Sequence, residues 1–319
     1  MPHDSPGRRS RIRPEPTGKS VALRPSDLVW FQKLHEHGPL PSSYLLAFTK
    51  SQRRNRKRSL ERLTDLFNED RTKHDGRYLD RPPQQFRTLD SRYNQLVHDL
   101  APAGHRALAA AGRLSDGVPN PSGPWLHRLM VACTTASVEL TTLDRPDLTF
   151  IPAHQILTRA ATELRYPVPI MDPASGSRFT KDLLPDALFG LQYHTATGDR
   201  FRFFAVECDR ATEPATSANW NRKSWRRSLL QYQSYVGGRR YRVHLQLTAP
   251  LLVLNVTTDP KRQAKMVAVT EEAAGKLAYL LFQTWPAFGR VWRPPIPRTD
   301  LLAGNWQRAG QTPFLIDRP

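Results

Sequence analysis

The sequence predicts a mixed α/β protein of 319 residues that folds as two domains. Its length exceeds that of a usual single domain, so each half can bury its own hydrophobic core. The residue pattern also changes along the chain: three helical segments precede two short strand segments, and strands then alternate with helices. A segment rich in Gly, Pro and Ser, residues 113–123, lies between these two patterns and is predicted to be a linker.

The composition favours a nucleic-acid partner. The formal net charge is +18, and most of the cations are arginines, which suit paired hydrogen bonds to phosphate. No uncharged apolar run is long enough to cross a bilayer, and the N-terminus lacks the apolar core of a secretory signal. The two cysteines, Cys133 and Cys208, lie far apart and outside any Cys/His spacing, which argues against a disulfide framework and a zinc site. We therefore expect a cytoplasmic protein that contacts nucleic acid.

The chain is predicted to begin with a disordered basic arm. Residues 1–24 hold four prolines and five arginines and few residues able to pack into a core. The first helix follows, because Leu28, Phe31 and Leu34 recur at helical spacing until Gly38-Pro39 ends the pattern.

The elements after this helix predict a winged helix-turn-helix domain over residues 25–112. A short helix ends at Phe48, and a longer helix opens at Ser51. The apolar face of the longer helix is marked by Leu60, Leu63 and Phe67. Two strand candidates, residues 76–79 and 94–100, follow and are joined by a polar loop rich in proline. Three helices followed by a two-stranded wing give this fold its name.

Basic residues gather where such a domain would meet DNA. The start of the third helix carries Lys50, Arg53, Arg54, Arg56, Lys57 and Arg58, and the wing carries Arg77, Arg81 and Arg87. A charge run of this kind is ordinarily just a solvated helix face. Here helix order, wing and net charge agree, so we predict contact with DNA phosphates and guanine edges in the major groove.

The second domain is predicted to be a layered α/β fold. Its expected elements are a helix at 124–143, a strand at 147–151, a helix at 152–163, two acidic strand segments, a helix at 218–236, a strand at 251–257 and a helix from residue 259. Cys133 falls on the inward face of the first of these helices and is interpreted as a small core residue rather than a nucleophile. The segment beyond about residue 270 has no interpretation from its pattern.

The two acidic strand segments, residues 184–189 and 203–209, predict a metal site. Side chains alternate along a strand, so Glu207 and Asp209 lie on one face, and Asp186 approaches from the neighbouring strand. Three carboxylates form a hard, oxygen-rich site of the kind that Mg²⁺ or Mn²⁺ prefers, and such a site suits cleavage of a phosphodiester. The alternative is a set of edge-strand carboxylates paired with arginines.

A polar stripe on the next helix adds to this prediction. Lys223, Arg227, Gln231 and Tyr235 recur at every fourth residue. They are therefore expected to share one helix face, from which a cation would stabilise the transition state while Gln231 and Tyr235 hold DNA phosphates. The alternative is an ordinary amphipathic helix that buries Leu229, Leu230 and Tyr232.

These motifs resemble a known family. Pro185-Asp186, then Glu207-x-Asp209 and the tail that ends at Glu213, are similar to the restriction-endonuclease-like PD-(D/E)XK fold of the replication-relaxation family, which includes Mob-C plasmid relaxases. The resemblance covers roughly residues 26–270 and implies a winged helix followed by a nuclease-like domain. We therefore expect the nuclease-like domain over residues 124–285, with residues 286–319 left as a C-terminal extension. The resemblance also implies that Asp186, Glu207 and Asp209 bind the metal and that Gln231 and Tyr235 match a Gln-x-x-x-Tyr element of the wider fold.

One departure from the general motif changes the expected chemistry. The motif ends in Lys, whereas Asp209 stands there in this chain, as in Mob-C relaxases. The cation must then come from Lys223 or Arg227, or a second metal must serve, or the domain binds DNA without cutting it.

Two other classes of site are disfavoured. His35-Glu36-His37 is the closest match to the metal-binding histidine pair of other relaxases, but it lies in a predicted helix, where residues two apart diverge, so we interpret these as surface residues. No Gly-x-x-x-x-Gly-Lys-Ser/Thr loop is present, which excludes a nucleotide-driven motor of that class.

The leading hypothesis is a relaxase-like nicking endonuclease of a plasmid or mobile element. Its expected partners are double-stranded DNA at an origin sequence and other mobilisation or replication proteins, and its expected cofactor is Mg²⁺ or Mn²⁺. The alternatives are an accessory DNA-binding protein with an inactive nuclease-like domain, and a repressor with a ligand-sensing second domain.

Overall fold

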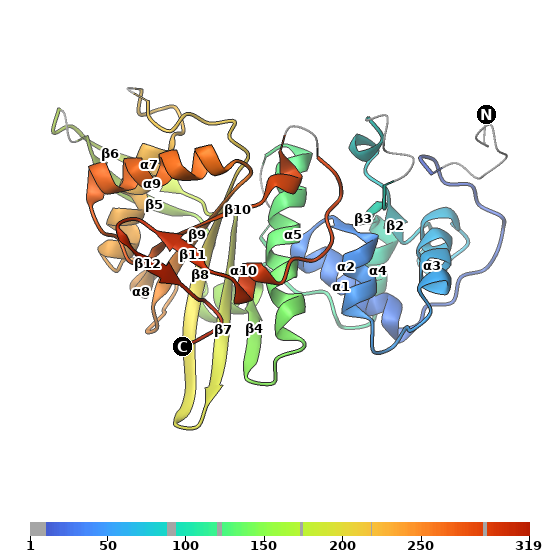
Figure 1. The fold of residues 1–319 in the computed structure, drawn as a ribbon. Helices are drawn as coiled ribbons and strands as arrows, with labels where there is room; N and C mark the ends of the chain where they lie inside the picture. Colours follow the sequence, from blue (N-terminus) through green and yellow to red (C-terminus); the bar gives the residue numbers. More distant parts are fainter. Residues whose placement is uncertain (1–10, 88–93, 120–122, 173–174, 218, 290–291) are drawn as a thin grey trace. The chain divides into compact units, whose positions relative to one another are not determined.

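The computed structural model describes residues 11–87, 94–119, 123–172, 175–217, 219–289 and 292–319. The chain forms two compact units (Figure 1). The first contains residues 1–115, 124–136 and 293–297, and the second contains 116–123, 137–292 and 298–319. This division differs from the contiguous domains expected from the sequence, because two later segments belong to the first unit. Among the described residues, no helix is long and apolar enough to cross a membrane.

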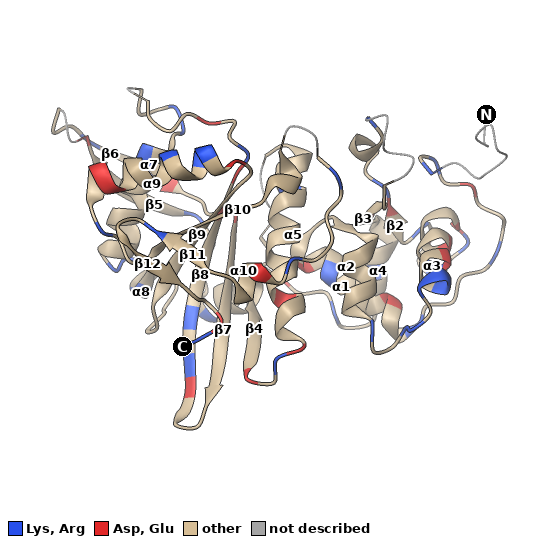
Figure 2. Ribbon diagram, viewed as in Figure 1, with Lys and Arg blue, Asp and Glu red and all other residues tan. Residues whose placement is uncertain are grey.

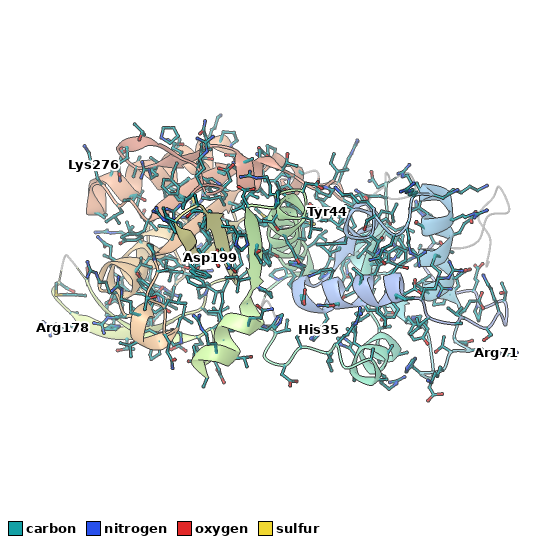
Figure 3. The ribbon with its side chains drawn as sticks, turned by 90° about the horizontal axis from the view of Figure 1, so that it is seen from below. His35, Tyr44, Arg71, Arg178, Asp199 and Lys276 are labelled. Carbon is teal, nitrogen blue, oxygen red and sulfur yellow. The ribbon has the colours of Figure 1, made fainter. Side chains whose placement is uncertain are left out.

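The first unit joins helices to a small antiparallel sheet. Its elements are α1 (Pro25–His37), β1 (Leu40–Pro41), α2 (Ser42–Phe48), α3 (Arg56–Asn68), β2 (Leu79–Asp80), η1 (Pro83–Phe86), β3 (Val97–Leu100), α4 (Pro102–Ala110) and the first part of α5 (Trp125–Thr142). The sheet order is β1-β3-β2. The three helices and the strands β2 and β3 appear in the predicted order, and the two-residue strand β1 is an addition that no sequence pattern indicated. Tyr44, labelled in Figure 3, is fully buried in this unit.

Helix α3 begins later than predicted. The sequence placed its start at Ser51, but the first helical residue is Arg56. The reason is the side chain of Asn55, which accepts a hydrogen bond from the backbone N–H of Arg58 and so caps the helix. Lys50, Arg53 and Arg54 therefore precede α3 instead of forming its first turn.

The described part of the N-terminal arm lies extended against α3. Thr17 donates from its backbone and its hydroxyl to Glu69, and Lys19 pairs with Asp65 at 2.6 Å. Val21 is buried. Disorder was expected over residues 1–24, but 11–24 are held by these contacts, whereas residues 1–10 lie outside the described residues.

The second unit is built on a seven-stranded mixed sheet of order β12-β11-β10-β9-β8-β7-β4. Its strands are β4 (Leu148–Pro152), β7 (Ala187–Thr195), β8 (Gly198–Asp209), β9 (Leu251–Thr257), β10 (Leu280–Thr284), β11 (Trp306–Arg308) and β12 (Gln311–Phe314). The pairs β4–β7 and β7–β8 are antiparallel, and β8–β9 and β9–β10 are parallel. Beside it, β5 (Tyr166–Met171) and β6 (Arg178–Leu183) form a two-stranded sheet. The predicted mixed α/β class is confirmed.

Helices pack on the sheet. They are the rest of α5, α6 (Ala153–Ala160), α7 (Trp225–Tyr232) with its π-helical continuation η3 (Gln233–Gly237), α8 (Tyr241–His244), α9 (Pro260–Ala274), η4 (Pro286–Phe288) and α10 (Asp300–Ala303). Phe203 and Ala205 on β8 share a core cluster with Leu229 and Tyr232 of α7. The indole of Trp225 donates to the backbone of Met266, which ties α7 to α9. Helix α7 therefore packs on β8, on the face that carries Phe203 and Ala205.

The C-terminal segment completes the sheet. Strands β11 and β12 extend its edge beyond β10, and Trp306 is fully buried with its indole N–H donating to the carbonyl of Leu301. No pattern in the sequence predicted these strands, because they are only three and four residues long.

Candidate functional site

Two of the predicted acidic residues, Asp186 and Glu207, meet at the end of β8. Asp186 immediately precedes β7, and its backbone N–H donates to the carbonyl of Val206 at 2.9 Å. Its Oδ2 accepts from the backbone N–H of Cys208 at 2.8 Å. Because Ala187 pairs with Val206, the register sets Asp186 opposite Glu207. The structure thus brings these two carboxylates together as the sequence predicted.

Glu207 is held from two sides. The hydroxyl of Tyr232 donates to its Oε1 at 2.5 Å, and the Nζ of Lys223 lies 4.0 Å from its Oε2 and 3.6 Å from Oε1 of Glu213. The Glu207 side chain is 12% exposed, whereas that of Lys223 is 44% exposed. Tyr232 and Glu213 were not predicted as site residues. Tyr232 lies three residues from Tyr235 and so does not belong to the predicted stripe, whose members recur at every fourth residue.

The electrostatics of this cluster favour an added cation. Burial, and secondly the charge of Asp186, raise the pKa of Glu207 to about 8, although Lys223 and Tyr232 oppose the shift. Burial lowers the pKa of Lys223, but the charges of Glu207, Asp186 and Glu213 outweigh it and raise that pKa above its ordinary value. Lys223 is therefore not sufficient to return the pKa of Glu207 to its ordinary value.

Asp209 does not join this pair. Its Oδ2 accepts from Arg262 of α9, at 2.7 Å from Nε and 2.5 Å from Nη2, and its Oδ1 accepts from the backbone N–H of Ala211. In the described part of the chain, the ligand oxygens of Asp186, Glu207 and Asp209 do not all lie within 4.8 Å of one another. Strand alternation still leaves Asp209 on the face of Glu207, but an arginine fixes it there.

Strand β9 contributes two buried oxygens beside the acids. Asn255 pairs with Glu207 in the register of β8 and β9, and Thr257 pairs with Asp209. Both side chains are 1% exposed. The described residues offer no hydrogen-bond partner to the Oδ1 of Asn255 or to the hydroxyl of Thr257. Buried polar atoms in proteins ordinarily form hydrogen bonds, so these two oxygens are exceptions.

The orientation of the Asn255 amide is determined by its partners. Its Nδ2 donates to the carbonyls of Leu281, at 3.1 Å, and Val253, at 3.5 Å, and a carbonyl can only accept. Leu281 belongs to β10, on the opposite side of β9 from β8. The Oδ1 therefore faces away from β10, toward the side on which Glu207 lies.

The residues at this strand end fit a divalent metal. Mg²⁺ and Mn²⁺ take oxygen ligands, and Asp186 and Glu207 would supply two carboxylates while the amide oxygen of Asn255 would accept from a water on the ion. Such a cation would stabilise the charged form of Glu207, whose pKa is raised, and its bound water would give the amide oxygen of Asn255 a partner.

The other residues of the predicted helical stripe hold neighbouring segments. Nη1 of Arg227 donates to the carbonyls of Trp220 and Asn221, at 3.3 and 3.2 Å. Nε2 of Gln231 donates to Lys181 and Asp182 on β6, and the hydroxyl of Tyr235 lies 2.7 Å from Nδ1 of His244. The stripe is not continuous, because α7 starts after Lys223, at the cap Ser224, and becomes a π-helix at Gln233.

The predicted basic residues of the first unit divide into two groups. Arg53 is held by Ser26 and Asp27 and lies 4.4 Å from the Trp30 ring centre, and Arg81 is buried against Phe67. The exposed group consists of Lys50, Arg54, Arg56, Lys57, Arg58, Arg77 and Arg87, of which Arg77 pairs with Asp80. Figure 2 shows the basic colour at one end of α3 and acidic residues further along it.

Of two further sequence predictions, the one for Cys133 is confirmed and the one for His37 is corrected. Cys133 is a fully buried core residue, as predicted, and burial raises the pKa of its thiol. His37 is not a surface residue: it is buried, with Nδ1 2.8 Å from the hydroxyl of Thr135. The difference arises because His37 lies on the buried face of α1, together with Leu34.

Comparison with known proteins gives one match. No curated protein and no solved structure matches the chain. Residues 31–248, well over half of the chain, match the family model described as replication-relaxation. The matched range includes the acid pair, Lys223 and Tyr232, and ends before Asn255.

Proposed function

The chain belongs to the replication-relaxation family, which indicates a role in plasmid replication or mobilisation, and on this premise we propose that it is a DNA-nicking enzyme. In this proposal the first unit binds duplex DNA at an origin and the second cleaves one strand with Mg²⁺ or Mn²⁺. The observation that carries the proposal is the half-buried pair Asp186 and Glu207 with Lys223 beside it.

The chemistry assigns a task to each residue of the cluster. A bound metal would neutralise charge on the scissile phosphate and lower the pKa of an attacking water. Asp186 and Glu207 would hold that metal, and Tyr232 fixes the carboxylate of Glu207. Lys223 is exposed enough to reach a DNA phosphate and would stabilise the negative charge that develops there. Asn255 would orient a water through its free oxygen.

Several features of the fold support this assignment. In the first unit three helices precede the strands β2 and β3, an order compatible with a winged helix-turn-helix, and exposed cations lie before and within the first turn of α3. In the second unit, adjacent antiparallel strands carry Pro185-Asp186 and Glu207, as the PD-(D/E)XK resemblance requires. Cations near α3 and an acid pair on the sheet suit a protein that binds DNA and cuts it.

A second candidate is an accessory protein that binds the same DNA without cutting it. The ion pair between Asp209 and Arg262 favours this alternative, because it removes one of the three predicted metal ligands. The alternative also accommodates the missing lysine of the general nuclease motif.

Nicking of supercoiled plasmid DNA tests the proposal. Plasmids carrying candidate origins would be incubated with the protein in Mn²⁺, Mg²⁺ or EDTA. We expect metal-dependent conversion to the open circle, with rates at least about 100-fold lower for Asp186→Ala and Glu207→Ala, since each removes a metal-binding group. The control is Asp199→Ala, an exposed carboxylate in the hairpin of β7 and β8, labelled in Figure 3.

Two results would contradict the proposal in different ways. Nicking that survives in both Asp186→Ala and Glu207→Ala would remove the acid pair from the mechanism. Specific binding to an origin without nicking by the wild-type protein in either metal would favour the accessory protein.

A further inference from the structure

The second unit contains a cavity of about 620 Å³ near the end of the sheet opposite to the acid pair. Phe201 and Phe203 of β8 line it, whereas Glu207 lies four residues beyond Phe203 on the same strand. At the usual rise of a strand, this separation is about 13 Å. The cavity is therefore distinct from the proposed metal site.

Two rows of cross-strand neighbours form the floor of the cavity. Thr149, Gln192 and Phe201 are paired across β4, β7 and β8, and so are Ile151, Gly190 and Phe203. Gly190 is required here, because a Cβ at this position would lie 2.8 Å from the ring of Phe203 and 3.3 Å from Cβ of Ile151. The aromatic ring of Phe203 lies over the glycine instead.

The walls come from α6 and from the segment before β9. Gln155, Ile156 and Arg159 of α6 form one wall. Gln246, Thr248 and Ala249 form the other, and the alternating Leu245 and Leu247 are buried in the core. This alternation turns Gln246 and Thr248 outward, to the cavity.

The lining combines a flat apolar surface with free amide groups. Phe201 is 41% exposed, a large fraction for a phenylalanine on a central strand. Gln192 uses its NH₂ group on Asp199 and Gln246 uses its own on the carbonyl of Ala160, so their carbonyl oxygens remain available. Gln155 and Arg159 make no hydrogen bond or ion pair with any described residue. Aromatic faces and side-chain amides are the groups that proteins use to stack and read nucleobases.

Exposed cations lie in the segment that leads to this wall. Arg239, Arg240 and Arg242 lie within or just before α8, and all three side chains belong to exposed residues. None of them forms an ion pair within the described part of the chain. Proteins that bind single strands pair such cations, which contact phosphates, with aromatic residues that stack on bases.

We propose that this cavity binds an unpaired nucleobase of single-stranded DNA. Phe201 stacks on the base, the amides of Gln155, Gln192 and Gln246 face its polar edge, and the arginines 239, 240 and 242 contact neighbouring phosphates. The inference rests on the proposed function only in the source of the strand, which is the DNA opened for cleavage.

Fluorescence anisotropy with labelled oligonucleotides tests the inference. The probes are a strand of fifteen thymidines and an abasic strand of equal length and charge, both with EDTA, an excess of unlabelled duplex to occupy the first unit, and a fixed salt concentration of about 150 mM. We expect the thymidine strand to bind at least roughly tenfold tighter than the abasic strand. Phe201→Ala should weaken only the thymidine strand, by roughly 5- to 100-fold.

Three further variants test separate parts of the inference. Phe201→Trp keeps a stacking face and should restore the affinity, which separates stacking from misfolding. Met171→Ala on β5 removes another exposed apolar side chain and should change nothing. Arg240→Ala should weaken both strands equally, since phosphates are common to them.

The inference is overturned if the two strands bind equally, or if Phe201→Ala behaves as Met171→Ala does. Its failure is separable from failure of the nuclease proposal, because Asp186→Ala and Glu207→Ala should retain the preference for bases while losing cleavage.

Discussion

Glu207 is the residue on which the proposed chemistry turns. It is half-buried, it accepts a short hydrogen bond from Tyr232, and it lies opposite another carboxylate. Its raised pKa has a direct effect on stability. Below about pH 4.5 Glu207 is protonated in both states, whereas between that pH and about pH 8 the unfolded chain loses the proton and the folded protein keeps it. Stability therefore falls as the pH rises through this window.

Replacing Glu207 with Gln should remove this pH-dependent cost. At pH 8 and in EDTA, the variant should unfold at a temperature roughly 5 °C higher than the wild type, corresponding to about 2 kcal/mol, and the difference should vanish near pH 4.5. Addition of Mn²⁺ at pH 8 should stabilise the wild type but not the variant. Thermal unfolding followed by circular dichroism measures both effects. Equal stabilisation of the two proteins by Mn²⁺ would mean that the ion binds elsewhere.

Much of the site could be predicted at this scale, and the missing part has a clear cause. Alternation along β8 correctly predicted that Glu207 and Asp209 share a face, and the Pro-Asp segment correctly predicted the approach of Asp186. Arg262 and Asn255 come from elements that lie some 50 residues later in the chain. No local pattern reveals such partners, since they are determined by the order of strands in the sheet.

Among the elements, α3 and the segment before it determine how the first unit would contact DNA. The cap at Asn55 shortens the helix, so that exposed cations occupy both its first turn and the preceding loop. Arg53, by contrast, closes the base of this loop through its ion pair with the fully buried Asp27. A run that appeared uniform in the sequence thus contains one structural arginine and several exposed cations, because burial depends on what packs against each position.

The salt dependence of duplex binding should distinguish the exposed cations from the structural Arg53. Arg56→Ala or Lys57→Ala should weaken duplex binding and reduce the slope of log affinity against log salt by about one unit, without changing the unfolding temperature. Arg53→Ala should instead lower the unfolding temperature, because it leaves the carboxylate of Asp27 with Arg62 as its remaining cation. Anisotropy titrations at several salt concentrations and thermal unfolding measure the two outcomes. An unchanged slope for both Arg56→Ala and Lys57→Ala would place that helix face in solvent.

At the scale of the whole molecule, the first unit is assembled from distant parts of the chain. Nε2 of Gln95 donates to the carbonyls of Pro294 and Pro295, and the hydroxyl of Tyr44 donates to the carbonyl of Ile296. The segment 293–297 therefore satisfies polar groups on α2 and near β3. Contiguous domains were expected from the sequence, because composition marks linkers but does not reveal that a late segment such as 293–297 belongs to the first unit.

An N-terminal fragment should consequently be less stable than the unit it comes from. We expect a fragment of residues 1–136 to unfold at a lower denaturant concentration than the first unit in the full chain, since Tyr44 and Gln95 lose partners for their polar groups. Gln95→Ala in the full chain should reproduce part of this loss, on the order of 1 kcal/mol. Chemical denaturation monitored by tryptophan fluorescence measures the difference, with Lys73→Ala as an exposed control in the same unit. A fragment as stable as the intact unit would show that the returning segment adds nothing.

The returning segment also sets an order of events during synthesis. The chain emerges from the ribosome N-terminus first, so α1, α2 and α3 emerge long before residues 293–297. The unit that carries the basic helix α3 therefore stays incomplete until residues 293–297 have been translated. Its maturation is thereby coupled to synthesis of the segment 293–297, and a product that lacks this segment would compete poorly for the DNA that we propose the protein binds.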